Sequence, residues 1–154
     1  SRVALLHTKK AIKEAATPEY RQSAADVTAN APALASGLAD EGMRPVSGGT
    51  DTHLALIDLQ GLGITGTQAE ERSDAAGITL NKNAIPYDPQ PPAVASGIRV
   101  GTPCVTTQGM GTGEMKTVAS LIGRAVRATD DTEAKAVRAE VSELVAAFPA
   151  YPAD

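Results

Sequence analysis

An arginine at position 99 lies inside an apolar segment that is otherwise typical of a buried strand. The segment, residues 94–105, has the sequence VASGIRVGTPCV, and its glycines at 97 and 101 would let a ligand approach the backbone. A guanidinium stays charged and is costly to bury unpaired, so Arg99 must face water, a carboxylate or a phosphate. Two interpretations are open. Arg99 forms an internal salt bridge or occupies an exposed strand position, or it binds a substrate carboxylate through two parallel hydrogen bonds.

Residues 47–53, with the sequence SGGTDTH, are a second candidate site. Their glycines and small polar residues predict a tight loop before a strand. Residues two apart on a strand share a face, so Asp51 and His53 could form an acid/base pair there. The alternative is a turn in which Asp51 only caps the backbone.

A third candidate is the segment NKNAIPYDP at residues 81–89. The side chain of Asn83 offers both a donor and an acceptor, as binding of a heterocyclic amide requires. Asparagine, aspartate and proline are also ordinary loop residues, so a plain surface loop is the alternative.

The sequence contains no recognisable reaction centre. The segment GMGTGEMK at residues 109–116 does not match a phosphate-binding glycine motif, and no serine lies in a Gly-x-Ser-x-Gly context. Two distant histidines and one cysteine do not form a metal-ligand cluster. We expect Cys104, which has no base nearby, to be a small core residue. The chain therefore has binding groups without catalytic ones.

Composition narrows the class of protein. With 154 residues, 42% of them hydrophobic, the chain is long enough for one domain with one core. Its net charge of −4 and lack of a basic block argue against a nucleic acid or an anionic membrane as partner. A single cysteine fits a reducing compartment, and neither a membrane span nor a secretory signal is visible. We therefore expect a soluble, cytoplasmic protein.

The hydrophobic pattern predicts helices at both ends of the chain and three short strands between them. Pro32 predicts a kink or a break in the second helix, and residues 82–95, which carry four prolines, predict a functional or disordered loop. About three short strands covered on one face by helices predict an α/β fold, specifically an α+β sandwich. The predicted helices are 2–16, 17–40, 67–76 and two around 115–125 and 137–148; the predicted strands are 53–59, 78–81 and 97–101.

Three segments together resemble the C-terminal part of serine hydroxymethyltransferase. VSGGTDTHLALIDL, AGITLNKNAIPYDP and SGIRVGTP occur in the order and at the spacing of that family, and KEAATPEY resembles its junction between interdomain helix and small domain. The resemblance covers nearly the whole chain, best from about residue 11 to 128. It implies the small C-terminal domain of the aspartate-aminotransferase-like pyridoxal phosphate fold, with residues 1–16 ending the interdomain helix and 17–154 forming the domain.

The resemblance also implies roles for single residues. Arg99 matches the family arginine that binds the carboxylate of serine or glycine, and Asn83 matches the asparagine that hydrogen-bonds the pteridine of tetrahydrofolate. Asp51, His53 and Tyr87 are candidates for an active-site loop. The implied reaction interconverts serine and glycine, with pyridoxal phosphate as cofactor and tetrahydrofolate as co-substrate.

The family's Schiff-base lysine, which lies in a Thr-His-Lys context, has no counterpart here. We therefore expect the cofactor to be bound mainly by an N-terminal large domain absent from this chain, and the chain alone to be inactive. The family implies a homodimer or homotetramer. The chain begins at Ser1 without methionine, which predicts a piece of a longer protein; a trimmed methionine or a tag remnant is the alternative.

Some positions depart from the family pattern. Thr52 stands where asparagine is usual, Gln108 where arginine is common, and Ala93 and Ala95 where larger residues or threonine are frequent, which would widen the pocket. An α-methylserine hydroxymethyltransferase or a relative of threonine aldolase or transaldolase is therefore an alternative. A second alternative is a free-standing, non-catalytic binding or dimerisation domain, against which the retention of Arg99 and Asn83 argues.

Overall fold

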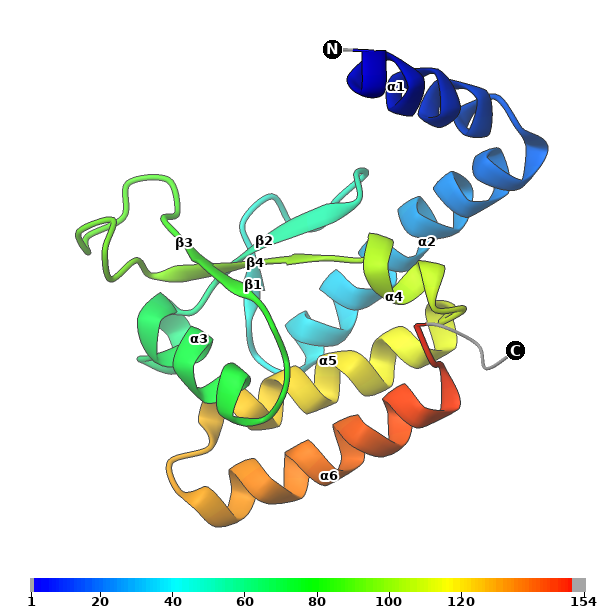
Figure 1. Cartoon of the computed structure of the whole chain (residues 1–154). Helices are drawn as coiled ribbons and strands as arrows, with labels where there is room; N and C mark the ends of the chain where they lie inside the picture. Colours follow the sequence, from blue (N-terminus) through cyan, green and yellow to red (C-terminus); the bar gives the residue numbers. More distant parts are fainter. Residues whose placement is uncertain (1, 151–154) are drawn as a thin grey trace.

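A four-stranded antiparallel sheet with helices on one side forms the body of the protein (Figure 1). The computed structural model describes residues 2–150, and side chains from residue 9 onward. The strands are β1 (Arg44–Pro45), β2 (Leu54–Asp58), β3 (Asn81–Asn83) and β4 (Gly97–Gly101). The helices are α1 (Arg2–Ala15), α2 (Pro18–Asp40), the 3-10 helix η1 (Gln60–Leu62), α3 (Gly66–Ala75), α4 (Pro103–Thr107), α5 (Thr112–Arg127) and α6 (Asp131–Ala147). The predicted α+β architecture is confirmed.

Strand β4 is an interior strand of the sheet. The strand order is β1-β2-β4-β3, so β4 is hydrogen-bonded to β2 on one side and to β3 on the other. In this register Arg99 lies opposite Leu56 of β2 and Asn81 of β3. Side chains directly opposite each other in an antiparallel pair share a face, so these three residues lie together.

The two faces of the sheet differ in burial. Ala55 and Ile57 of β2 and Ile98 and Val100 of β4 are buried, whereas Arg99 on the other face is exposed. Fully burying an isoleucine or leucine contributes about 1.5–3 kcal/mol, so this alternation determines which face carries the core. We refer to the face that carries Arg99 as the open face.

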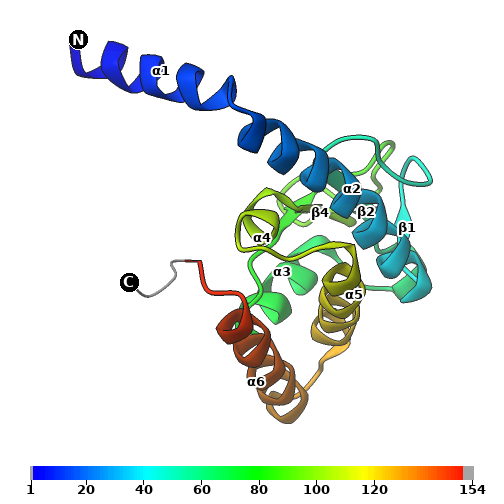
Figure 2. The ribbon, with the colours of Figure 1, turned by 90° about the vertical axis from the view of Figure 1, so that its right-hand side faces the viewer.

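The helices form two layers beneath the buried face. Helices α2 and α5 lie side by side against the sheet, α3 packs beside α5, and α6 packs on the outer side of α3 and α5 (Figure 2). The core of the first layer includes Leu34 and Leu38 of α2 and Met115 and Ile122 of α5. Val137 joins α6 to a second, smaller cluster.

The predicted helix boundaries are supported by caps. The side chain of Thr17 accepts a hydrogen bond from the backbone of Tyr20 at the start of α2, and Asp130 does the same for Thr132 and Glu133 at the start of α6. Gly42 and Gly77 adopt φ values of +79° just beyond the ends of α2 and α3, a conformation that glycine adopts without strain.

The predicted break at Pro32 does not occur, since α2 runs through it from Pro18 to Asp40. A proline inside a helix costs about 3 kcal/mol. Leu34 and Leu38, which follow it, are 3% and 0% exposed, and their burial outweighs that cost.

Two other predictions need correction, and some short elements were missed. The strand predicted at 78–81 is found at Asn81–Asn83, because the backbone of Ile78 is still hydrogen-bonded to Ser73 at the end of α3. The short elements β1, η1 and α4 were not predicted. Cys104 is exposed rather than in the core; it lies on the short helix α4, none of whose residues is buried.

Both edges of the sheet are occupied or short. On edge strand β3, the backbone N–H of Lys82 donates to Oε1 of Glu70 on α3 at 3.2 Å, and its ammonium pairs with Oε2 at 3.3 Å. The opposite edge, β1, has two residues, of which Pro45 has no N–H.

Helix α1 and the first part of α2 project away from this body (Figures 1 and 2). Side chains of residues 9–16 are exposed. No helix within residues 2–150 combines the length and the apolar composition needed to cross a membrane.

Candidate functional site

Arg99 has no protein partner for its charge among the residues that the structure describes. Its backbone is fixed by ladders to β2 and β3, and its side chain is exposed on the open face. No ion pair or side-chain hydrogen bond joins the guanidinium to another described residue. The internal salt bridge is therefore wrong, and the exposed strand position is what the structure has.

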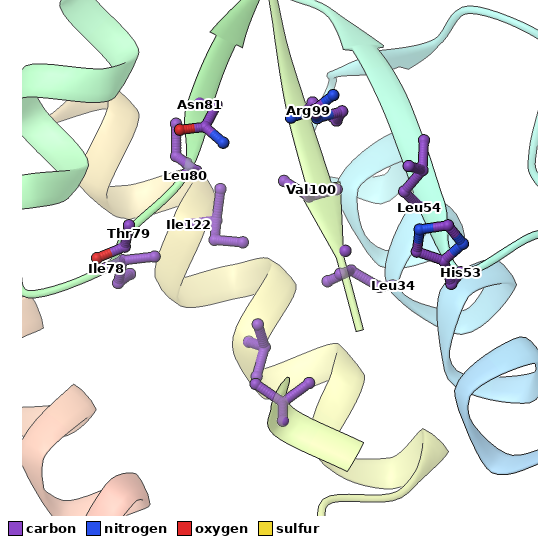
Figure 3. Close-up of a pocket in the computed structure, with 13 residues that line it drawn as sticks. Leu34, His53, Leu54, Ile78, Thr79, Leu80, Asn81, Arg99, Val100 and Ile122 are labelled. Atoms are coloured by element: carbon purple, nitrogen blue, oxygen red, sulfur yellow. The ribbon is translucent and has the colours of Figure 1, made fainter. Parts of the chain in front are cut away.

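A pocket of about 460 Å³ lies beside Arg99. Strand β3 begins only at Asn81, so Val100 and Gly101 of β4 have no partner on that side, and residues 78–80 diverge from β4 (Figure 3). Arg99, Asn81 and His53 belong to the lining, and most of the rest is apolar. The apolar lining consists of Leu34, Leu54, Ile78, Leu80, Val100, Val105, Val118 and Ile122.

Asn81 was missed by the sequence analysis, although a signal for it was present. It lies two residues before Asn83 on the same strand, so both share the open face with Arg99. Asn81 is directly opposite Arg99, and Figure 3 shows the two side chains at the same level of neighbouring strands. Its amide can donate to a carboxylate held by the guanidinium.

Glycine occupies the positions on either side of Arg99, 97 and 101, for different reasons. A Cβ on Gly97 would lie 2.6 Å from Cγ2 of Ile85 and 2.7 Å from the carbonyl oxygen of Ile57, so glycine is needed there for packing. Gly101 has its nearest such contact at 3.4 Å and lines the pocket. Only Gly101 fits the expectation that glycine opens the backbone to a ligand.

Asn83 ends β3 on the open face, opposite Gly97. It is half-buried, and its side-chain N–H₂ donates to the carbonyl oxygen of Ala84 at 2.8 Å. Arg99 and Asn83 are diagonal neighbours across the β3–β4 pair, about 7–8 Å apart in a regular sheet. The structure therefore places the two residues close enough to contact one extended ligand.

Asp51 and His53 do not share a strand face. They lie in an irregular bend before β2, both exposed, and no hydrogen bond or ion pair joins their side chains within the described chain. Nor does Asp51 cap the turn. Thr50 does so, because its hydroxyl donates to the carbonyl oxygen of Leu54 at 2.6 Å and accepts from the backbone of Thr52 at 3.1 Å.

Residues 84–96 form an ordered loop between β3 and β4, and Tyr87 lies in a turn near its start. Tyr87 is fully exposed and does not line the pocket beside Arg99. Neither do Ala93 and Ala95, and Ala95 is buried at the base of the loop, with its carbonyl oxygen accepting from Gly66 at 2.9 Å. The lining of this pocket therefore does not support the expectation that these alanines widen it.

Asp88 holds this loop together, and the sequence analysis did not identify it. Oδ2 accepts from the backbone N–H of Ile85 at 3.1 Å and of Ser96 at 2.8 Å. Oδ1 accepts from the backbone of Gln90 at 2.9 Å and from the hydroxyl of Ser96 at 2.6 Å. Desolvation raises the pKa of Asp88, but these hydrogen bonds, led by the Ser96 hydroxyl, outweigh it and lower the pKa to about 2.

The charge of Arg99 suits the pocket to an anion, but its described lining has no lysine that could form a Schiff base with an aldehyde. No described lysine lines it; Lys82, the nearest along the chain, is paired with Glu70. No group of three or more potential metal ligands occurs in the described residues. The residues present thus fit the carboxylate of a small molecule, and they do not fit the covalent attachment of pyridoxal phosphate.

Comparison with known proteins shows the family of the chain. The family model described as serine hydroxymethyltransferase matches residues 4–122. The serine hydroxymethyltransferase of Desulforapulum autotrophicum is 52% identical over 144 residues, which are 94% of this chain and 34% of that protein. The chain therefore spans about a third of the length of this relative.

Proposed function

Because this chain belongs to the serine hydroxymethyltransferase family, we propose that it is the C-terminal part of an enzyme that interconverts serine and glycine, with tetrahydrofolate as one-carbon carrier. In this proposal residues 1–16 end an interdomain helix and residues 17–154 form the small domain. An N-terminal large domain of the same protein is its partner, and the complete enzyme is a homodimer or homotetramer.

The observation that carries the proposal is the unpaired guanidinium of Arg99 on an interior strand. An arginine fixed in this way has a defined direction and no internal carboxylate competing for it. Its planar fork binds a carboxylate through two parallel hydrogen bonds, which fixes the rotation of the amino acid as well as its position. Each such charge-assisted bond contributes about 1.5–3 kcal/mol.

The rest of the pocket completes the binding role. Asn81 can donate to the same carboxylate, and the apolar lining around Leu54 and Ile122 keeps water from the side of the bound amino acid. Asn83, on the same face, is proposed to hydrogen-bond the pteridine of tetrahydrofolate. Asp51, His53 and Tyr87 are proposed to lie on loops that face the remainder of the active site.

Pyridoxal phosphate supplies the electron sink of this reaction when it is bound in the complete enzyme. The pocket around Arg99 has no lysine to hold it, so this chain's part is to bind and orient the amino acid. We therefore expect the 154-residue chain alone not to convert serine.

The test is Arg99→Lys in the complete enzyme. Lysine keeps the charge but loses the two parallel hydrogen bonds, so KM for serine should rise and turnover fall, with kcat/KM lower by about 10- to 100-fold. Bound pyridoxal phosphate should be unchanged. Arg138→Lys on α6 is the matched control, because Arg138 is exposed and donates only to the carbonyl oxygen of Ala75, on the helical side of the molecule.

Equal serine kinetics in the two variants would remove Arg99 from the binding site. A complete protein that converts neither serine nor glycine would favour a non-catalytic binding domain. A wild-type preference for α-methylserine or for threonine cleavage would retain the carboxylate contact and change the substrate.

A further inference from the structure

The loop of residues 84–96 joins the two strands that carry the proposed ligand contacts. Asn83 is the last residue of β3 before the loop, and Gly97 is the first residue of β4 after it. The side chain of Asn83 donates to the carbonyl oxygen of Ala84, the first residue of the loop, so the shape of the loop bears on how that side chain is oriented at the end of the β3–β4 ladder. The loop lacks regular secondary structure, so its shape depends on specific hydrogen bonds.

We propose that Asp88 is a positioning residue for this site: its carboxylate ties the start, the middle and the end of the loop together, and thereby fixes Asn83 relative to Arg99. The inference rests on the proposed function, because Asn83 and Arg99 are its folate and amino-acid contacts. Asp88 itself faces the inside of the loop and contacts neither ligand in this proposal.

The geometry of the four hydrogen bonds supports this role. Both carboxylate oxygens are used, and each spans the loop: Oδ2 joins Ile85 to Ser96, and Oδ1 joins Gln90 to Ser96. A carboxylate can accept at both oxygens, whereas an amide or a hydroxyl cannot replace all four bonds. Asp88 is therefore the one described residue whose side chain connects these three points of the loop.

Ser96 transmits the position of the loop to the sheet. It is 4% exposed, its backbone and hydroxyl both donate to Asp88, and its carbonyl oxygen accepts from Leu59 just beyond β2 at 2.9 Å. Ile85, also bonded to Asp88, packs against Gly97 so closely that no Cβ fits between them. Asp88 thus acts on both residues that border the start of β4.

The backbone of the loop is held in an unfavourable conformation. Tyr87 and Ala95 both have φ of +56°, and they are the non-glycine residues with positive φ in the described chain. Pro86 and Tyr87 occupy the centre of a turn closed by the hydrogen bond from Asp88 N–H to Ile85, where glycine or asparagine is preferred at the position of Tyr87. Such strain persists only where surrounding contacts over-determine it, and it concentrates at functional sites.

Helix α3 supports the same loop from the other side. The backbone N–H groups of Gly66 and Thr67, in the first turn of α3, donate to the carbonyl oxygens of Ala95 and Val94 at 2.9 and 3.0 Å. These contacts fix the base of the loop and do not reach residues 85–90. Removal of the Asp88 carboxylate should therefore release the front of the loop while its base stays in place.

The experiment uses the complete enzyme with Asp88→Asn, which has nearly the same shape but loses acceptor capacity at one oxygen. We expect KM for tetrahydrofolate to rise about tenfold or more, with a smaller rise in KM for serine and unchanged bound pyridoxal phosphate. Amide hydrogen exchange in peptides covering residues 84–96 should become faster, while exchange in α5 and α6 stays as in the wild type. Asp74→Asn is the matched control, because Asp74 is exposed on α3 and its side chain makes no hydrogen bond to another described residue.

Ser96→Ala provides an independent variant, since it removes one of the four bonds and keeps the carboxylate. It should give a smaller rise in the same KM, and the double variant Asp88→Asn/Ser96→Ala should be less than additive because the two changes remove a shared bond. If Asp88→Asn does not fold, Ser96→Ala carries the test.

Two results would overturn the proposal. One is faster exchange in the loop with both KM values unchanged. The other is a loss of folded enzyme and cofactor without any change in KM, which is the mark of a purely structural role. A wild-type enzyme that does not use tetrahydrofolate would instead refute the proposed function, and the exchange data would still report separately whether Asp88 holds the loop.

Discussion

Two arginines lie on the same face of the sheet, and they differ in whether a carboxylate lies opposite them. Arg44 on β1 is opposite Asp58, whose Oδ2 accepts from its Nε at 3.1 Å and from its Nη2 at 2.6 Å. Arg99 on β4 is opposite Leu56 and Asn81, neither of which is charged. Along β2, the residue opposite Arg44 is a carboxylate, and the residue two positions earlier, opposite Arg99, is apolar.

This difference in partners gives the two arginines different roles: Arg44 stabilises the fold, and Arg99 is available to bind a ligand. Asp58 is 4% exposed, and the guanidinium of Arg44 supplies an oppositely charged partner for its carboxylate, so this pair belongs to the internal packing of the sheet. Arg99 is solvated and stabilises nothing that the structure describes. A face that contains a carboxylate but leaves one guanidinium unpaired presents that guanidinium to an external anion.

Replacing each arginine by alanine tests this contrast most strongly. Arg44→Ala should lower the free energy of unfolding by about 2 kcal/mol, because it leaves the buried Asp58 carboxylate with only the Gln60 backbone bond. Arg99→Ala should change the free energy of unfolding by no more than about 0.5 kcal/mol from the wild-type value, as is usual for an exposed residue. Urea unfolding of both variants measures the two values, and equal losses would contradict the contrast.

A second test, with a smaller expected effect, gives Arg99 an internal carboxylate like the one that Arg44 has. Asn81→Asp places a carboxylate directly opposite Arg99, where it competes with the substrate as an internal partner. KM for serine should rise about tenfold, which corresponds to about 1.4 kcal/mol of lost binding. Asn81→Ala is the control, and a KM no higher in Asn81→Asp than in Asn81→Ala would show that residue 81 does not reach the guanidinium.

The smallest effect is the pH dependence of the stability that Asp88 contributes. This dependence appears only in acid, below the pH of ordinary assays. The pKa of Asp88 falls from 3.8 to about 2 on folding, so its ionised form stabilises the folded state above about pH 4, and this contribution is lost as the pH falls through 2. The difference in unfolding free energy between wild type and Asp88→Asn should be constant from pH 5 to 8 and shrink between 4 and 2. Acid titrations of both proteins measure it, since other carboxylates cancel in the difference. A difference that changes between pH 6 and 8 would contradict this assignment.

The strand that carries Arg99 could be predicted with its bounds, because an apolar run flanked by glycines and closed by Pro103 has few other interpretations. The strand before it could not. Ile78 and Leu80 have the apolar character of a strand, but Ile78 is partly buried and Leu80 buried against the core before the chain joins the sheet at Asn81. Hydrophobicity indicates burial, and the partner that provides it is decided by tertiary structure.

The candidate site could be predicted in part. Arg99 and Asn83 were found through a resemblance, and the register places them on one face. The Asp51–His53 pair failed because the hydroxyl of Thr50 closes a turn that delays the strand until Leu54. Asp88 could not be found from spacing, since its partners at residues 85, 90 and 96 follow no period.

The covered edges of the sheet have a consequence for assembly. The outward N–H of Lys82 is already bonded to Glu70, and Pro45 at the other edge has no N–H to offer. A strand from another molecule would have to displace an ion pair at one edge and would find two residues at the other. Growth of a continuous intermolecular sheet from these two edges is therefore disfavoured, and we expect self-association of this domain, including aggregation at high concentration, to use its helices and loops more than these strands.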